Sequence, residues 1–133
     1  MKNKFVTSFC LVVGLLIVCA PVFAHHGGSE YDQKNPITLK GTVTQFYWAN
    51  PHCQIYVDVK DSKGEVVNWV IETLAPAVMN RTGWNSHLLH PGDMITITLV
   101  PSKNGSPVGM VRKLVLANGQ EYGPGTLGEQ PPQ

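Results

Sequence analysis

Apolar and polar residues alternate in five stretches of this chain, and a period of two is typical of β-strands with one buried face. In the clearest stretch, every second residue from Cys53 to Val59 is apolar, and the intervening residues are polar or tyrosine. The pattern predicts strands over 37–48, 53–60, 66–72, 94–100 and 108–116. Turn-forming residues separate the strands, as at Asn50-Pro51. The chain is therefore expected to be an all-β protein.

The first predicted strand changes the side on which its apolar residues lie. Leu39 and Val43 share one face, whereas Phe46 and Trp48 fall on the opposite parity. One extra residue in a strand shifts the parity in this way, so a β-bulge is expected near Gln45. A bulge also bends a long strand.

One short helix is predicted, between the third and fourth strands. Pro76 suits the first turn of a helix and Gly83 suits its C-terminal end, so the helix should run to Thr82. Three strands, a helix and two strands follow one another in the five-stranded OB barrel. We therefore expect residues 37–122 to form a small OB-like barrel, with a small open sheet or a sandwich as the alternative.

The first 24 residues have the pattern of a secretory signal peptide. Two lysines precede an apolar run over 5–20, and Val22-Phe23-Ala24 supplies a cleavage site. The run is near the lower length limit for a membrane span, about 17 residues. Cleavage after Ala24 would give a periplasmic or secreted protein with no stable membrane insertion. A membrane anchor and lipidation at Cys19 are the alternatives.

Removal of this segment would change the charge and the cysteine content. The net charge of +1 at pH 7 would fall to about −1, because two lysines are lost. Such a chain has no basic surface for nucleic acid. Cys53 would be the only cysteine left, so no internal disulfide can form, and we expect a buried thiol. A flexible lead-in (25–36) and a flexible tail (123–133) would flank the barrel.

The same cleavage would create a metal-binding N-terminus. The α-amine and the imidazole of His25 can chelate one ion, and the imidazole of His26 follows directly. Nitrogen donors of this kind favour Cu(II) among the first-row divalent ions. His52, in the loop after the first strand, is the preferred third ligand, and His87 and His90 are the reserves. The simpler interpretation is that two histidines at a flexible terminus bind copper without a physiological role.

Three aromatic side chains suggest a metal-independent alternative. Trp48, Tyr56 and Trp69 could form a platform on the barrel face, as aromatic rings do in OB folds that bind oligonucleotides or sugars. The partner would then be a protein, a glycan or a small ligand. Packing of these rings in the core and at its rim is the simpler interpretation.

The sequence contains no recognisable catalytic motif. It has no glycine-rich phosphate loop, nucleophile elbow or pair of acids at a useful spacing. Glu72 is a single carboxylate at a strand end, expected to pair with Arg81 or to cap a loop. His52 and Cys53 are neighbours, and they would share one ion only if the backbone there were irregular. A binding protein is therefore expected rather than an enzyme.

Short motifs along the chain also carry a family resemblance. They are His25-His26, 39–43, Asn50-Pro51-His52, Asn68-Trp69, 81–84, Pro91-Gly92-Asp93 and 104–107. Through them the sequence resembles a family of small exported bacterial proteins that carry a domain of unknown function. The resemblance covers nearly all of the chain after residue 24. It implies a periplasmic or secreted single domain and no particular activity.

Overall fold

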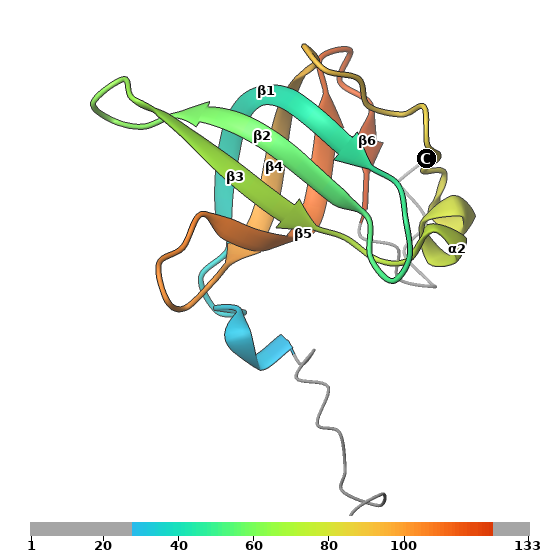
Figure 1. Ribbon diagram of the computed structural model, residues 1–133, viewed down its shortest axis with the longest axis horizontal. Helices are drawn as coiled ribbons and strands as arrows, with labels where there is room; N and C mark the ends of the chain where they lie inside the picture. The colour runs from blue at the N-terminus through green and yellow to red at the C-terminus, as the bar shows by residue number, and fades with distance from the viewer. Residues whose placement is uncertain (1–27, 124–133) are drawn as a thin grey trace, which may run out of the picture.

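The computed structural model describes residues 28–123 and consists mainly of β-strands (Figure 1). Its elements are η1 (Gly28–Glu30), β1 (Ile37–Tyr47), β2 (Gln54–Lys60), β3 (Val66–Glu72), α2 (Pro76–Met79), η2 (Asn80–Thr82), β4 (Met94–Pro101), β5 (Val108–Leu116) and β6 (Glu121–Tyr122). The expected signal peptide lies outside the described residues. None of the helices within 28–123 has the length and apolar character needed to cross a membrane.

The strands close into a barrel. β1 pairs antiparallel with β2 on one side and with β4 on the other, while β3 pairs with β2, and β5 with β4. A parallel pairing of β3 with β5, from Val70 opposite Val108 to Glu72 opposite Met110, completes the ring. The predicted five-stranded OB-like barrel, with its helical segment between the third and fourth strands, is confirmed. The open sheet is excluded, because the β3–β5 pairing joins its two edges.

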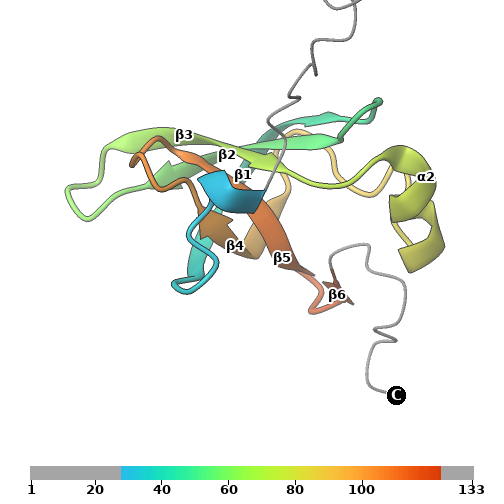
Figure 2. The same cartoon turned by 90° about the horizontal axis from the view of Figure 1, so that it is seen from below.

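The predicted bulge in β1 is also present. Val43 lies opposite Val57, but the next pair joins Gln45 to Tyr56, so one residue of β1 has no counterpart in β2. The bulge brings Phe46 back to the side of the buried Ile55, its partner in β2. Beyond the barrel, the hairpin of β2 and β3 projects at the end away from α2 (Figures 1 and 2).

A single apolar core fills the barrel and continues beneath the helical segment. Its fully buried members include Val43, Ile55, Val57, Ile71, Met79, Trp84, Ile95, Ile97, Leu99 and Leu114. The helical stretch begins at Pro76 as predicted and ends at Gly83, whose positive φ of 86° is readily adopted by glycine. The Trp84 indole then covers the core and donates a hydrogen bond of 3.1 Å to the Gly123 carbonyl.

The residues that precede β1 lie against the loop between β4 and β5. Tyr31 forms a β-bridge with Ser102, and the Asp32 amide donates to the carbonyl of Pro101. The Lys103 amide in turn donates to the Glu30 carbonyl. Within the expected lead-in, Glu30, Tyr31 and Asp32 are therefore attached to the barrel, whereas residues 33–36 are exposed.

Candidate functional site

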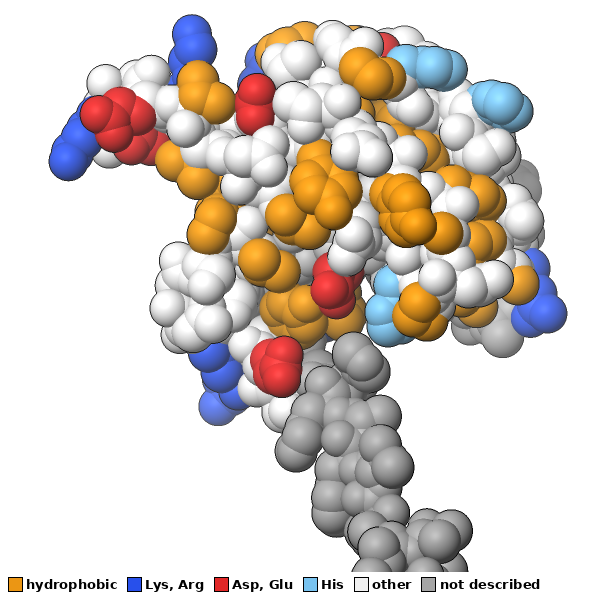
Figure 3. Space-filling view, in the orientation of Figure 1, with side chains coloured by type: hydrophobic (Ala, Val, Ile, Leu, Met, Phe, Trp, Pro, Cys, Tyr) orange, Lys and Arg blue, Asp and Glu red, His pale blue; other side chains and the backbone are white. Residues whose placement is uncertain are grey.

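The outer face of β1, β2, β3 and β5 carries the side chains that point away from the core. Residues opposite each other in neighbouring strands share a face, so the register defines two rows across this surface. One row contains Tyr56, Val70 and Val108, and the next contains Gln54, Glu72 and Met110. Figure 3 shows this side of the molecule, with hydrophobic side chains gathered across its middle. We call it the outer face below.

Glu72 lies at the end of β3 and is held by a residue from the start of the described chain. The Tyr31 hydroxyl donates a hydrogen bond of 2.9 Å to Oε2 of Glu72. Tyr31 is 8% exposed. Burial and the bond to a carboxylate both favour the neutral phenol, so they raise the pKa of Tyr31 well above its ordinary value. This bond fixes the residues before β1 on the outer face.

His52 lies in the loop between β1 and β2, beside the same row. The β2–β3 ladder continues past the Gln54–Glu72 pair, because the Thr73 amide donates to the Cys53 carbonyl over 2.9 Å. Cys53 is fully buried, and adjacent residues of an extended chain point to opposite sides. The half-buried His52 is thereby directed to the side of Glu72, as its diagonal neighbour at about 7–8 Å.

The three rings expected to form a platform do not share one surface. Trp69 lies opposite the buried Val57, and both Trp69 and Trp48 pack against the core cluster. Tyr56 instead lies on the outer face, where its hydroxyl donates to Oε1 of Gln54 over 3.1 Å. All three side chains are half-buried. Another tyrosine, Tyr47, is exposed close to Tyr56. It lies opposite Gln54 in the pairing of β1 with β2, and Gln54 is the residue that accepts the Tyr56 hydrogen bond.

The remaining candidate ligands are placed as follows. His25 and His26 lie outside the described residues. His87 and His90 are exposed in turns, where the amide of His87 donates to Asn85 and that of His90 to Asp93.

Cys53 is a free, buried cysteine, and burial raises the pKa of its thiol. It lies on the core side, away from His52. Within residues 28–123, no group of three or more His, Cys, Asp or Glu side chains is arranged to hold a metal ion. A site with three such ligands would therefore need donors from outside that range.

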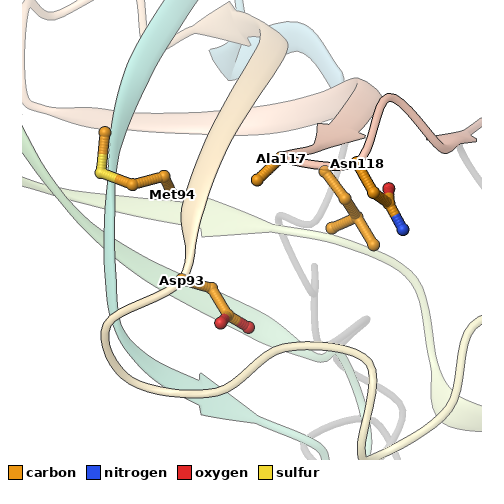
Figure 4. A pocket seen from close by; sticks show the side chains of 5 residues that line it. Asp93, Met94, Ala117 and Asn118 are labelled. Carbon is orange, nitrogen blue, oxygen red and sulfur yellow. The ribbon is translucent and has the colours of Figure 1, made fainter.

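A shallow hollow lies at another place, where β4 begins and β5 ends. It has a volume of about 220 Å³ and is lined by Asp93, Met94, Leu116, Ala117 and Asn118. Figure 4 shows that Asp93, Met94 and Asn118 point in different directions. Their polar groups do not converge on a point, and none of the residues expected to bind a ligand lines this hollow.

A comparison with protein families shows to which family the chain belongs. The profile of a family of unknown function (DUF6152) matches residues 13–112. The chain belongs to this family. The DUF6152 match extends into β5 and so includes most of the barrel, Tyr31, His52 and Glu72. A comparison with curated proteins found no match.

Sequence reasoning missed the Tyr31–Glu72 contact of this DUF6152 protein. Glu72 was expected to pair with Arg81 or to cap a loop, but its partner is the neutral hydroxyl of Tyr31. The alternation of buried and outward-facing residues along β3 could have predicted the side on which Glu72 lies. Glu72 shares the parity of Val70 and opposes that of the buried Ile71, which puts it on the outer face.

Proposed function

We propose that this protein is an exported binding module that holds Cu(II) at its mature N-terminus. Cleavage after Ala24 supplies the α-amine of His25, the imidazoles of His25 and His26 add two nitrogen donors, and His52 completes the set. The observation that supports the proposal best is the Tyr31–Glu72 hydrogen bond. It holds Tyr31, which follows His26 by five residues in the sequence, on the face that His52 borders.

The chemistry of the donors favours copper over other divalent ions. Amine and imidazole nitrogens suit the tetragonal geometry of Cu(II), which also has the highest affinity in the first-row series for such ligands. The donors must be deprotonated to bind, so the affinity should increase between about pH 5 and pH 8. Storage, delivery and buffering of copper in the periplasm or outside the cell are the roles that such a site would serve.

Copper titration of two forms of the chain tests the proposal. One form begins at His25 and the other carries a single alanine before His25. Isothermal titration should give a sub-micromolar Cu(II) dissociation constant for the first form and a binding at least about tenfold weaker for the second. Equal, weak binding by both forms would refute the proposal. Mass spectrometry of the N-terminus from cell-envelope protein tests the cleavage separately.

Histidine variants test which imidazole completes the site. His52→Ala in the form that begins at His25 should weaken Cu(II) binding by about tenfold or more. His87→Ala is the matched control, since His87 is an exposed histidine in a turn. An unchanged affinity in His52→Ala would remove His52 from the site and leave only the terminal chelate.

A second candidate function is a metal-independent interaction module. It is favoured by Tyr47, which is 51% exposed on the outer face near Tyr56. A partner of this surface would be a protein, a glycan or a small ligand. NMR titration of the metal-free protein with a soluble N-acetylglucosamine trimer probes the glycan case. Shifts confined to β1–β3 and lost in Tyr56→Ala would support it, whereas an unchanged spectrum would count against this ligand class.

A further inference from the structure

We propose that β3 pairs edge to edge with β3 of a second copy of this chain. The pairing uses residues 66–69, which precede the part of β3 that lies against β5. Backbone hydrogen bonds hold the two copies together, and apolar side chains next to them lose contact with water. The pairing does not depend on copper, because none of the histidines takes part in it.

β3 has a free edge before Val70. The pairing with β5 begins only at Val70, whose preceding contact is a hydrogen bond of 3.0 Å from the Val70 amide to the Pro107 carbonyl. Backbone groups of alternate residues in a strand point to the same edge, so those of Val66 and Asn68 point to this edge too. They receive no hydrogen bond from any residue within 28–123. The hairpin of β2 and β3 extends past the start of β5, which leaves this edge accessible (Figure 1).

The free edge lacks the features that normally prevent two strands from pairing. Natural proteins protect exposed edges with lysine, proline, a bulge or a covering loop. β3 contains neither lysine nor proline, and it pairs with β2 without a shift of register. Val66 is 59% exposed, the highest value among the large hydrophobic side chains of the described part of the chain. An apolar edge of this kind is suited to cover and be covered by another strand.

Two copies of this edge are complementary to each other. In an antiparallel arrangement with a two-fold axis at Val67, Val66 lies opposite Asn68 of the partner subunit, and Asn68 lies opposite Val66 of the partner subunit. Each of these pairs exchanges two backbone hydrogen bonds, because both residues direct their N–H and C=O groups outward. The two Val67 side chains meet at the axis. A two-fold contact uses the same surface of both molecules, so the pairing closes as a dimer and does not continue into a fibre.

The charges next to the edge also favour a second copy. In the two-fold arrangement Trp69 lies opposite Glu65 of the partner subunit, so the β2–β3 turn of one copy approaches the β4–β5 loop of the other. The turn carries Asp61, Lys63 and Glu65, with a net charge of −1, whereas Lys103 gives the loop a charge of +1. Opposite charges that face each other across an interface fix its register.

Disulfide trapping tests the pairing and its register. The two Val67 residues form a non-hydrogen-bonded pair with Cα atoms about 4.5 Å apart, a separation that a disulfide can bridge. Val67→Cys, in metal-free protein expressed from His25 onward, should therefore form a covalent dimer under mild oxidation. Val66→Cys is the matched control. Val66 is the more exposed residue, but its diagonal distance to Val66 of the partner subunit is about 7–8 Å, which is too long for a disulfide.

Equal cross-linking of the two cysteine variants would reflect random collision and would refute the register. The absence of cross-linking in Val67→Cys would refute the pairing. The native Cys53 is buried and so does not compete for the new thiol.

Analytical ultracentrifugation tests the association without a new cysteine. An interface of one short strand predicts a weak dimer, with a dissociation constant of about 10 to 100 µM. Val66→Lys places a charge on the edge and should weaken the dimer by at least about tenfold. Met94→Lys is the matched control, since Met94 is exposed on β4, and it should associate as the parent does. A parent that stays monomeric up to about 500 µM, or an equal loss in both lysine variants, would overturn the proposal.

Discussion

The Tyr31 hydroxyl lies 2.9 Å from Oε2 of Glu72, which joins two residues that are 41 positions apart in the chain. The contact attaches the residues before β1 to the strand that closes the barrel. The hydrogen bond exists only while the buried phenol of Tyr31 keeps its proton, so the contact depends on pH.

Alkaline pH should weaken this attachment. Burial and Glu72 raise the pKa of Tyr31, so folding stabilises the protonated phenol relative to the unfolded chain. This contribution is complete below about pH 10, the pKa of an unfolded tyrosine, and decreases as the pH increases further. Urea unfolding between pH 7 and pH 11 should show a free energy of unfolding that decreases above pH 10 by up to about 1.4 kcal/mol per pH unit more than in Tyr31→Phe. Parallel curves for the two proteins would contradict the prediction.

A methyl group at Gly41 should destabilise the barrel. A Cβ built on Gly41 would lie 2.5 Å from the Asp58 carbonyl oxygen and 2.7 Å from Cγ1 of Val57. The closest atom belongs to the backbone, so relief requires β1 and β2 to move apart. Gly41→Ala should therefore lower the free energy of unfolding by about 3 kcal/mol, the upper part of the range for overpacking. Thermal and urea unfolding measure the loss.

Gly123→Ala is the control for that substitution. No atom lies within 4 Å of a Cβ built on Gly123, and its carbonyl would still accept the Trp84 bond. The change should alter the free energy of unfolding by less than about 0.5 kcal/mol. A similar loss in both alanine variants would mean that close packing at β1 is not the cause.

Trp84 should be the most costly aromatic residue to remove. It is 1% exposed, contacts Tyr122 edge to face at 5.6 Å between ring centroids, and donates to Gly123. Trp84→Phe keeps most of the volume and should cost about 1 to 2 kcal/mol, whereas Trp84→Ala should cost about 3 to 5 kcal/mol. Tyr47→Ala, at an exposed ring, is the comparison and should cost much less in the same unfolding experiment.

The Cys53 thiol should be unreactive in the folded protein. It is fully buried, and burial raises its pKa, so both access and the fraction of thiolate are reduced. Reaction with a disulfide reagent at pH 8 should be at least about 100-fold slower in buffer than in 6 M guanidinium. Fast labelling of the folded chain would show that the loop before β2 opens readily.

Local pattern was enough to predict the barrel. Alternation located the strands, and the change of parity at Phe46 located the bulge, since both depend on which side of one strand is buried. The same parity assigns Trp69 to the core, because it matches Val67 and Ile71 on β3. The two residues of β6 are too few to give a periodic signal.

Long-range contacts could not be read from local pattern. Tyr31 is a single apolar residue between polar neighbours, so nothing nearby in the sequence marks it as buried. Glu72 was expected to pair with Arg81 or to cap a loop, whereas the barrel brings to it a neutral hydroxyl from a residue 41 positions earlier in the chain. The candidate site depends on this contact between distant segments.

The barrel can close only after β5 has been synthesised, because its parallel pairing with β3 completes the ring. Among the described residues, β5 is the last long strand to be synthesised, and until it pairs with both β3 and β4 the barrel has two open edges. Pairings between such distant segments form slowly. Most of the described residues must therefore be synthesised before a stable barrel can form, and until then the apolar side chains of β1 to β4 stay exposed to water.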